Sequence, residues 1–424
     1  MKIVQVNTFP YKATGAVMMG IHRLLTERGE DSYVVWARGR DARDDHEIVI
    51  KDELGVRLHG VYTRLTDRTG FASARATRRL LKRLDEIGPD VVHLHNIHGY
   101  YLHIGMLFDY LKARRIPLVW TLHDCWAMTG HCAFFDMVGC ERWKTGCHDC
   151  PQKSTYPASA FLDASRFNWS RKKELFTGLS GVIVTPCEWL AGYVRQSYLR
   201  DYPVKVIYNG IDLNVFTPSD DAQKREVRQK YGLDERPLVL GVASEWTERK
   251  GLRDIVSLSE KLSDGVQFAA VGLTAEQIRA LPPAVKGIGR TANAGELAAL
   301  YSAADVFINP TYEDNFPSTN VEALACGTPV LTYDTGGSPE SIRIGQTLAD
   351  RPIGAVVNKL TSSRADLDQV TQALNDLLAS SRRPDGSPDP ALETACRRAA
   401  GAFEAGRRLN EYVPLYEGLL QGTL

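Results

Sequence analysis

The residues best suited to chemistry in this sequence lie between Asp305 and Glu340. A buried strand over residues 306–309 ends in a polar loop that carries Asp314, and a helix starting near Ser318 carries Glu322, eight positions after Asp314. The free amides and the positive dipole end of a helix N-terminus bind anions. The pattern therefore predicts an anion site with two carboxylates beside it.

Motifs of several other nucleotide and hydrolytic sites are missing. No Gly-x-Gly-x-x-Gly follows the first strand and no Gly-x-x-x-x-Gly-Lys-Ser/Thr occurs, which argues against a dinucleotide-binding enzyme and a P-loop NTPase. Neither Gly-x-Ser-x-Gly nor His-Glu-x-x-His is present. The Gly336-Gly337 pair instead marks a place where backbone is expected to approach a ligand closely.

Short apolar runs alternate with longer helical patterns along the chain, which is typical of parallel sheets with helices on both faces. In the first half, strands are expected at 2–6, 32–36, 90–95, 117–122 and 181–184, and helices at 14–28, 73–87 and 105–114. In the second half, strands are expected at 237–242, 266–271, 305–309, 329–332 and 354–357, and helices at 252–262, 296–304 and 318–325. The predicted fold class is α/β, with two Rossmann-like doubly wound domains and a ligand-binding cleft between them.

The length of 424 residues suits two domains. The turn signal Asn209-Gly210 predicts the linker. We therefore expect an N-terminal domain over 1–207, with a cysteine-rich loop over 125–151, and a C-terminal domain over 208–392. The proline-rich stretch 382–390 is expected to be a loop, and a C-terminal helix over 393–424 is expected to pack back on the first domain.

Composition limits the function classes. Lys and Arg together number 51, as do Asp and Glu, so the formal net charge is zero. A nucleic-acid-binding domain usually carries a basic excess, so we expect no nucleic-acid partner. No apolar run approaches the ~20 residues of a membrane span. The first residues have the pattern of a buried strand rather than of a signal peptide, and we expect a cytoplasmic protein.

The segment 305–340 resembles the donor-binding signature of retaining GT-B glycosyltransferases of the group 1 and family 4 type. That signature is an acidic residue, seven intervening residues, Glu, and then Ala-x-Ala-x-Gly-x-Pro-Val, which residues 314–330 match with Asp314 and Glu322. Asn209-Gly210-Ile211-Asp212 is similar to the interdomain element of the family. The Thr-Gly-His-Cys and Gly-Cys-x-x-Cys-Pro elements are most similar to colanic-acid and exopolysaccharide biosynthesis transferases, and the resemblance spans nearly the whole chain.

The resemblance implies roles for individual residues. Glu322 would bind the nucleotide ribose, and Asp314, where the family usually has Glu, would face the donor sugar. Lys250 would bind the diphosphate as a point charge, and His123 is the best-matched active-site histidine, so the expected catalytic residues are His123, Asp314 and Lys250. The expected donor-binding residues are Gly15, Arg249, Lys250, Arg290, Asp314, Asn315, Phe316, Ser318, Thr319 and Glu322. Arg249 or Arg290 would supply a guanidinium that the family usually has directly after the strand.

The implied activity is transfer of a sugar, with retention of configuration, from a UDP- or GDP-sugar to a saccharide or a polyprenyl-diphosphate-linked saccharide of the cell surface. Fixed positive groups would meet the charge of the leaving diphosphate, so catalysis would require no cofactor. Two alternatives stay open. One is a nucleotide-sugar epimerase or a phosphorylase on the same fold, and the other is a non-catalytic nucleotide-sugar-binding scaffold.

Two further clusters have both a functional and a structural interpretation. Cys132, Cys140, Cys147 and Cys150 suit a structural zinc site, or are reduced thiols in a packed loop. Seven basic residues lie between Arg64 and Arg83, and one predicted helix carries five of them, namely Arg75, Arg78, Arg79, Lys82 and Arg83. They form either a solvated face or a peripheral contact with anionic lipid at the inner face of the membrane.

Overall fold

The computed structural model describes residues 1–262 and 265–423. The chain divides into two compact units: unit 1 comprises Met1–Tyr208 and Gly406–Leu424, and unit 2 comprises Asn209–Ala405. Residues 393–405, which were expected to pack on the first domain, belong to unit 2 instead. Ser263, Asp264 and Leu424 fall within the predicted domain ranges but lie outside the described residues.

Unit 1 is built on a seven-stranded parallel sheet with the order β3-β2-β1-β4-β5-β6-β7. The strands are β1 Lys2–Asn7, β2 Asp31–Trp36, β3 Glu47–Val49, β4 Val91–Leu94, β5 Leu118–Thr121, β6 Gly181–Thr185 and β7 Val204–Val206. The five strands predicted from buried β-branched runs are confirmed, and β3 and β7 are additional short edge strands. The direction of strand addition reverses between β1 and β4, and the carboxyl ends at such a switch point are the usual ligand site of an open α/β sheet.

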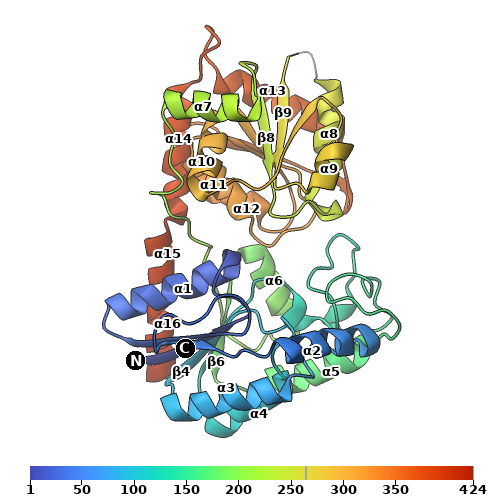
Figure 1. Cartoon of the computed structure of the whole chain (residues 1–424), viewed down its shortest axis with the longest axis vertical. Helices are drawn as coiled ribbons and strands as arrows, with labels where there is room; N and C mark the ends of the chain where they lie inside the picture. Colours follow the sequence, from blue (N-terminus) through green and yellow to red (C-terminus); the bar gives the residue numbers. More distant parts are fainter. Residues whose placement is uncertain (263–264, 424) are drawn as a thin grey trace. The chain divides into compact units, whose positions relative to one another are not determined.

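Helices cover both faces of this sheet (Figure 1). The helices before the linker are α1 Lys12–Glu27, α2 Glu53–Thr66, α3 Ala74–Ile87, α4 Ile104–Arg114, α5 Ser165–Phe176 and α6 Glu188–Gln196. α1 shares one apolar core with α16 (Val413–Gln421), to which Ile21, Leu25, Tyr416 and Leu419 contribute. α3 packs on α4 and α4 packs on α5, and they form the other layer.

Unit 2 repeats this architecture with six parallel strands in the order β10-β9-β8-β11-β12-β13. The strands are β8 Leu238–Val242, β9 Gln267–Val271, β10 Val285–Ile288, β11 Val306–Asn309, β12 Val330–Tyr333 and β13 Gly354–Val357. All five predicted strands are confirmed, and β10 is an additional edge strand. The switch point of this sheet lies between β8 and β11.

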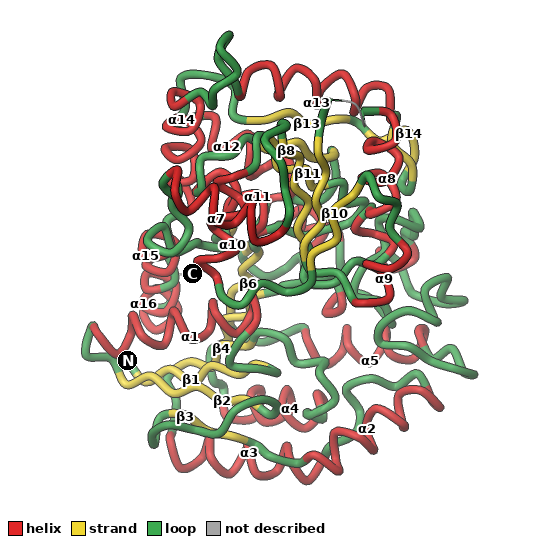
Figure 2. Tube along the Cα trace, turned by 45° about the horizontal axis from the view of Figure 1, so that its top comes forward, coloured by secondary structure: helices red, strands yellow, loops and turns green. Residues whose placement is uncertain are grey.

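The helices of unit 2 also form two layers, which the tube in Figure 2 shows on either side of the strands. α8 Leu252–Lys261, α9 Ala275–Ala280 and α13 Leu367–Ser381 lie on one side. The other layer contains α7 Asp221–Tyr231, α10 Ala294–Ala303, α11 Ser318–Ala325, α12 Ser338–Gln346 and α14 Pro390–Ala400. None of the helices in the described part of the chain is both long and apolar enough to cross a membrane.

The prediction of one continuous C-terminal helix over 393–424 is wrong. The segment forms α14, a 3-10 turn at Gly401–Phe403, α15 Ala405–Asn410 and α16. Pro414 stands in the first turn of α16, where its missing N–H costs no helical hydrogen bond, but a proline inside a longer helix would break it. The chain therefore leaves unit 2 at Ala405, and α16 completes the core of unit 1.

Candidate functional site

The predicted anion site of unit 2 lies at the switch point of its sheet. Lys250 follows β8 and Asp314 follows β11, and these two strands are neighbours in the sheet. Because all strands are parallel, both residues come from carboxyl ends at the same edge. Tyr312 and Tyr333 support this edge, since both hydroxyls donate to Oδ2 of the buried Asp254, at 2.5 and 2.8 Å.

Lys250 and Asp314 form an ion pair between Nζ and Oδ2, and each side chain is 17% exposed. Burial of Asp314 favours its protonated form, but the charges of Lys250 and Arg249 outweigh that effect and hold the pKa of its carboxyl below the ordinary value. Asp314 is therefore a carboxylate at neutral pH. The structure brings together Lys250 and Asp314, to which the family resemblance gives the donor diphosphate and the donor sugar.

The two arginines proposed for the diphosphate are placed differently. Arg249 Nη1 donates to the carbonyl of Glu313 at 2.7 Å, and the carbonyl of Arg249 accepts from the Tyr312 amide at 2.7 Å. Arg249 therefore orients the loop that carries Asp314. Arg290 is exposed after the edge strand β10, three strands away from β11, and forms no side-chain hydrogen bond or ion pair within residues 1–262 and 265–423. The structure does not bring Arg290 to the Lys250–Asp314 pair.

Glu322 is half-buried on α11 and is held by two hydroxyl groups. Tyr301, on α10, donates to Oε2 at 2.9 Å, and Ser318 donates to Oε1 at 3.0 Å. Burial raises the pKa of the Glu322 carboxyl, and the two hydrogen bonds offset only part of this effect. Sequence reasoning missed Tyr301, because a tyrosine on a separate helix gives no signal until α10 and α11 are packed together.

The N-terminus of α11 presents backbone donors at the same edge. Pro317 precedes the helix and no side chain caps it. The amide of Asn320 donates to the Pro317 carbonyl at 3.2 Å, whereas the amides of Ser318 and Thr319 donate to no acceptor among the described residues. This end of α11 has the polarity that an anionic ligand requires.

Four further residues of this region make contacts within the chain, and their expected contacts with a ligand stay predictions. Phe316 is buried and its ring lies 5.6 Å from that of Phe403, so it is a packing residue. The buried Asn315 accepts the Gly337 amide through its carbonyl, at 2.8 Å. Gly336, at φ +56°, leaves room for the chain itself, because a Cβ there would lie 1.6 Å from the carbonyl oxygen of Asp314. Gly336 and Gly337 thus fix the Asp314 loop through contacts within the chain.

Gly15 of unit 1 lies close to the segment that precedes its own helix. It is part of the first turn of α1 and it is buried. A Cβ at this position would lie 2.6 Å from the carbonyl oxygen of Phe9 and 2.6 Å from the carbonyl carbon of Pro10. The close approach that requires a glycine here is again to the chain itself.

Stacked histidines mark the switch point of unit 1. The ring centroids of His93 and His95 are 4.2 Å apart, and those of His95 and His123 are 5.4 Å apart. Burial lowers the pKa of His93 to about 3 and that of His123 to about 4, and it lowers the pKa of His95 well below the ordinary value. All three rings are therefore neutral at pH 7 and act as hydrogen-bonding groups.

The hydrogen bonds assign the tautomers of this cluster. Gln5 Nε2 donates to the Met18 carbonyl at 3.2 Å, so Gln5 Oε1 faces His95 Nε2, at 3.3 Å, and accepts its proton. His95 Nδ1 must then accept from His123 Nε2, at 3.1 Å. The lone pair of His123 therefore lies on Nδ1. Gln5 is a second functional candidate that the sequence did not reveal.

His93 and His98 have separate partners. His93 bonds Tyr416 of α16 at 2.7 Å and Thr121 at 2.8 Å, so it ties α16 to the sheet. His98 Nε2 lies 2.9 Å from Asp124 Oδ2, and Asp124 of this histidine–aspartate pair stands next to His123 in the sequence.

The four clustered cysteines line one small cavity with His131 and Trp143. A hydrogen bond from the Cys132 thiol lowers the pKa of Cys150 to about 7. No group of three or more His, Cys, Asp or Glu side chains in the described chain has the arrangement of a metal site. The cysteines share a cavity but do not present a ready zinc ligand set, and the zinc site stays a prediction.

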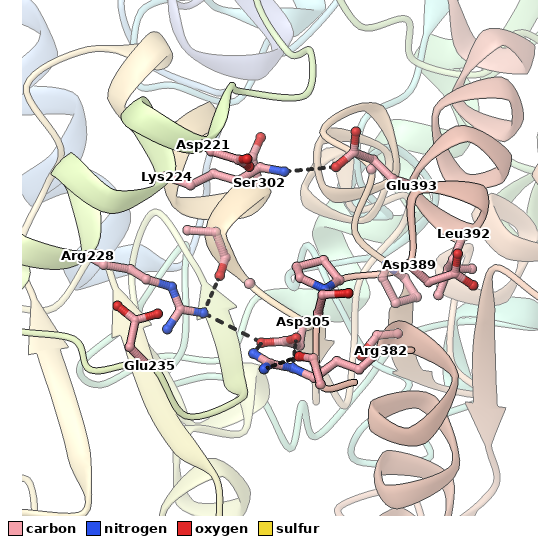
Figure 3. Close-up of a pocket in the computed structure, with 18 of the residues that line it drawn as sticks. Asp221, Lys224, Arg228, Glu235, Ser302, Asp305, Arg382, Asp389, Leu392 and Glu393 are labelled. Atoms are coloured by element: carbon pink, nitrogen blue, oxygen red, sulfur yellow. Dashed lines mark hydrogen bonds and ion pairs between the residues drawn. The ribbon is translucent and has the colours of Figure 1, made fainter. Parts of the chain in front are cut away.

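A cavity of about 390 Å³ lies at the opposite edge of the unit 2 sheet, where β11 and β12 begin (Figure 3). Several of its charges pair with one another: Arg382 binds both oxygens of Asp305, at 2.6 and 2.9 Å, and Arg228 lies 3.6 Å from the same carboxylate. The cavity is thus a structural ion-pair network, separate from the Lys250–Asp314 edge.

Comparisons with known proteins agree over both units. Residues 15–215 match the family model Glycosyltransferase Family 4, and residues 223–382 match Glycosyl transferases group 1. A protein of Escherichia coli (strain K12), WcaC, named as a colanic acid biosynthesis glycosyl transferase, is 24% identical over 442 residues and covers 99% of this chain and 100% of its own length.

Two solved structures share the fold. The sucrose-phosphate synthase of Thermosynechococcus elongatus has a TM-score of 0.68 with 16% identity and covers 99% of both chains. Anabaena HepE in complex with UDP-glucose has a TM-score of 0.63 with 15% identity and covers 99% of this chain and 100% of its own. With the two doubly wound units, these matches confirm the predicted GT-B architecture.

Proposed function

The chain belongs to the group 1 glycosyltransferases of the GT-B type, and from this membership we propose that it transfers a sugar from a nucleotide-diphosphate sugar to a saccharide or lipid-linked saccharide in cell-surface polysaccharide biosynthesis. The likeness to the E. coli colanic acid transferase supports the pathway class, and the likeness to a UDP-glucose complex supports the donor class. Retention of configuration is part of the proposal.

The observation that carries the proposal is the Lys250–Asp314 pair at the switch point, with Glu322 on the helix that follows. Breaking a sugar–phosphate bond places negative charge on the leaving diphosphate. We assign Lys250 and the amides of Ser318 and Thr319 to that charge, because fixed donors need no reorganisation when it develops. These groups are the reason why we expect transfer without a divalent metal.

We assign the two carboxylates to different parts of the donor. Glu322 retains acceptor capacity beyond its bonds from Tyr301 and Ser318, and we assign it to the hydroxyls of the nucleotide ribose. Asp314 is ionised beside Lys250, and we assign it to the hydroxyls of the donor sugar. When Lys250 contacts the diphosphate, Asp314 exchanges an ammonium partner for sugar hydroxyls.

In the proposed reaction the acceptor oxygen forms a bond to the anomeric carbon on the side from which the phosphate leaves. The sugar–phosphate bond breaks, and the acceptor proton passes to the departing phosphate oxygen. No side-chain nucleophile takes part. We assign acceptor binding to unit 1, at the carboxyl ends of β4 and β5, where the neutral rings of His95 and His123 lie.

The test is nucleotide diphosphate release from a panel of UDP- and GDP-sugars, with and without saccharide acceptors. We expect release from one donor, and Glu322→Gln should lower kcat/KM for it by about 10 to 100-fold, because a charge-assisted bond becomes a neutral one. Glu276→Gln, an exposed acid on α9, is the matched control and should leave activity unchanged. Binding of UDP and GDP is measured by calorimetry in parallel. A folded protein that neither binds these nucleotides nor releases them would refute the proposal.

A further inference from the structure

α2 differs from an ordinary amphipathic helix of a globular protein, because its polar face is buried and its apolar face is exposed. It buries His59 and Thr63, while Leu54, Leu58, Val61 and Leu65 are 68, 59, 54 and 50% exposed. These four positions are spaced by four, three and four residues, so they lie on one face of the helix. We call these four residues the α2 stripe. Figure 1 shows α2 at the periphery of unit 1.

The buried polar face explains why the helix does not turn over. His59 Nδ1 lies 2.9 Å from the Ser73 hydroxyl, and its Nε2 accepts the Gly70 amide at 3.1 Å. These bonds tie α2 to the segment that leads into α3. The polar face is thus fixed inside, and the α2 stripe is held in solvent by the fold.

A loop residue pair extends the apolar surface beyond the end of the helix. Phe161 is 72% exposed and Leu162 is 56% exposed. The Ala160 amide donates to the Arg64 carbonyl at 2.8 Å, so this loop is anchored on the last turn of α2. Single exposed apolar residues are ordinary on a protein surface, but a contiguous set of this kind marks an interaction surface.

Basic residues flank the α2 stripe. Arg57 and Arg64 are seven positions apart and lie together beside it on the exposed face, and Arg68 follows the helix. In the part of the chain that the structure describes, the Arg57 and Arg64 guanidinium groups form no hydrogen bond or ion pair. Glu53, at the start of the helix, is the one acid on this face of α2.

From this arrangement we propose that α2 lies in the interface of an anionic lipid bilayer, with the α2 stripe and Phe161–Leu162 among the acyl chains and Arg57 and Arg64 at the head groups. Exposed aliphatic side chains in one stripe with unpaired arginines beside it have the chemistry of an interfacial helix. Three of the basic residues of α3 are neutralised by ion pairs, since Arg79 pairs with Asp52, and Arg83 and Lys82 pair with Glu86. The proposal concerns unit 1 alone and does not depend on the donor site.

The test is flotation of the full chain with vesicles of phosphatidylcholine, with and without phosphatidylglycerol. We expect binding to the mixed vesicles at about 0.1 M salt and weaker binding at about 1 M, where the Debye length falls from ~10 to ~3 Å. The variant Leu58→Ser/Leu65→Ser should lower the partition coefficient on both vesicle types by at least about tenfold, because it removes methylene groups that would lie among the acyl chains of the bilayer. Arg57→Gln/Arg64→Gln should lower it about 25-fold on the anionic vesicles only.

The matched control is Leu360→Ser in unit 2, which removes an equally exposed leucine (56%) and should bind as the wild type does. Hydrogen exchange on the vesicles should show protection in residues 53–66 and 159–163. Equal partition of the wild type and the α2 double-leucine variant would overturn the proposal. So would the absence of vesicle binding together with a concentration-dependent dimer that Leu58→Ser/Leu65→Ser dissociates, since a second copy of the chain would then cover the α2 stripe.

Discussion

Lys250 is expected to have two separable roles, one in stability and one in catalysis. In Lys250→Ala, Asp314 keeps its burial but loses its ammonium partner. Exposed pairs contribute ~0 to 1 kcal/mol, and removing one partner of a fully buried pair costs ~3 to 5 kcal/mol. With 17% exposure on each side, and with the charge of Arg249 still nearby, we expect a loss of about 2 kcal/mol. The unfolding transition of unit 2 should fall by about 4 to 8 °C in calorimetry.

Removing the second charge should restore stability but not activity. In Lys250→Ala/Asp314→Asn no carboxylate is left unpaired, so the free energy of unfolding should return to within about 1 kcal/mol of the wild-type value. Transfer should stay about 100 to 1,000-fold below the wild type in both variants, because the diphosphate has lost a fixed cation. Lys261→Ala, which breaks the exposed pair with Asp368, is the control and should change neither property.

The pH dependence gives the sign of the stability effect. The pKa of Asp314 is lowered in the folded wild type, so its contribution is fully present above the unfolded pKa and is lost as pH falls through the folded pKa. The difference in free energy of unfolding between the wild type and Lys250→Ala should therefore be largest near pH 7 and should disappear as the pH falls below about 3.9. A difference that is independent of pH, or a double variant that recovers transfer, would refute this reasoning.

Two further predictions concern a glycine and a thiol. Gly336→Ala should lower transfer at least about tenfold and destabilise unit 2 by ~1 to 3 kcal/mol, because its Cβ would lie 1.6 Å from the Asp314 carbonyl oxygen. The control is Gly386→Ala, which also has a positive φ but no atom within 4 Å of the added Cβ, so it measures the effect of backbone strain alone. Equal effects of the two changes on transfer would contradict the argument. Cys150 should be alkylated by iodoacetamide with a midpoint near pH 7, measured by mass spectrometry, because the hydrogen bond from Cys132 lowers the pKa of Cys150. Labelling that rises only near pH 9 would show an unperturbed thiol. Labelling that requires a chelator first would show a bound metal.

Much of the framework could be predicted from the sequence. α11 and β13 have the predicted bounds, and Lys250 and Asp314 meet in an ion pair because each of them follows a strand at the switch point of the sheet. These successes share a cause: a buried run of apolar residues followed by a turn signal is a local pattern, and parallel strands bring their carboxyl ends together.

The rest depends on contacts between distant segments. Tyr301 reaches Glu322 only because α10 packs beside α11, and Gln5 reaches His95 only because β1 and β4 are neighbours. The exposed face of α2 was not foreseen for a different reason. An apolar stripe in a sequence indicates the buried side of a helix, and here His59 occupies that side.

The assignment of α16 to unit 1 affects how the protein is made on the ribosome. The hydroxyl of Tyr416 bonds His93, and Leu419 and Tyr416 fill the same core as Ile21. The N-terminal half therefore emerges first but lacks part of its interior until residues 406–424 are translated, about 200 residues after Tyr208. At ~5 to 20 residues per second this delay is on the order of 10 to 40 s. The contiguous unit 2 has all its residues earlier, which reverses the usual order in which a nascent chain completes its domains.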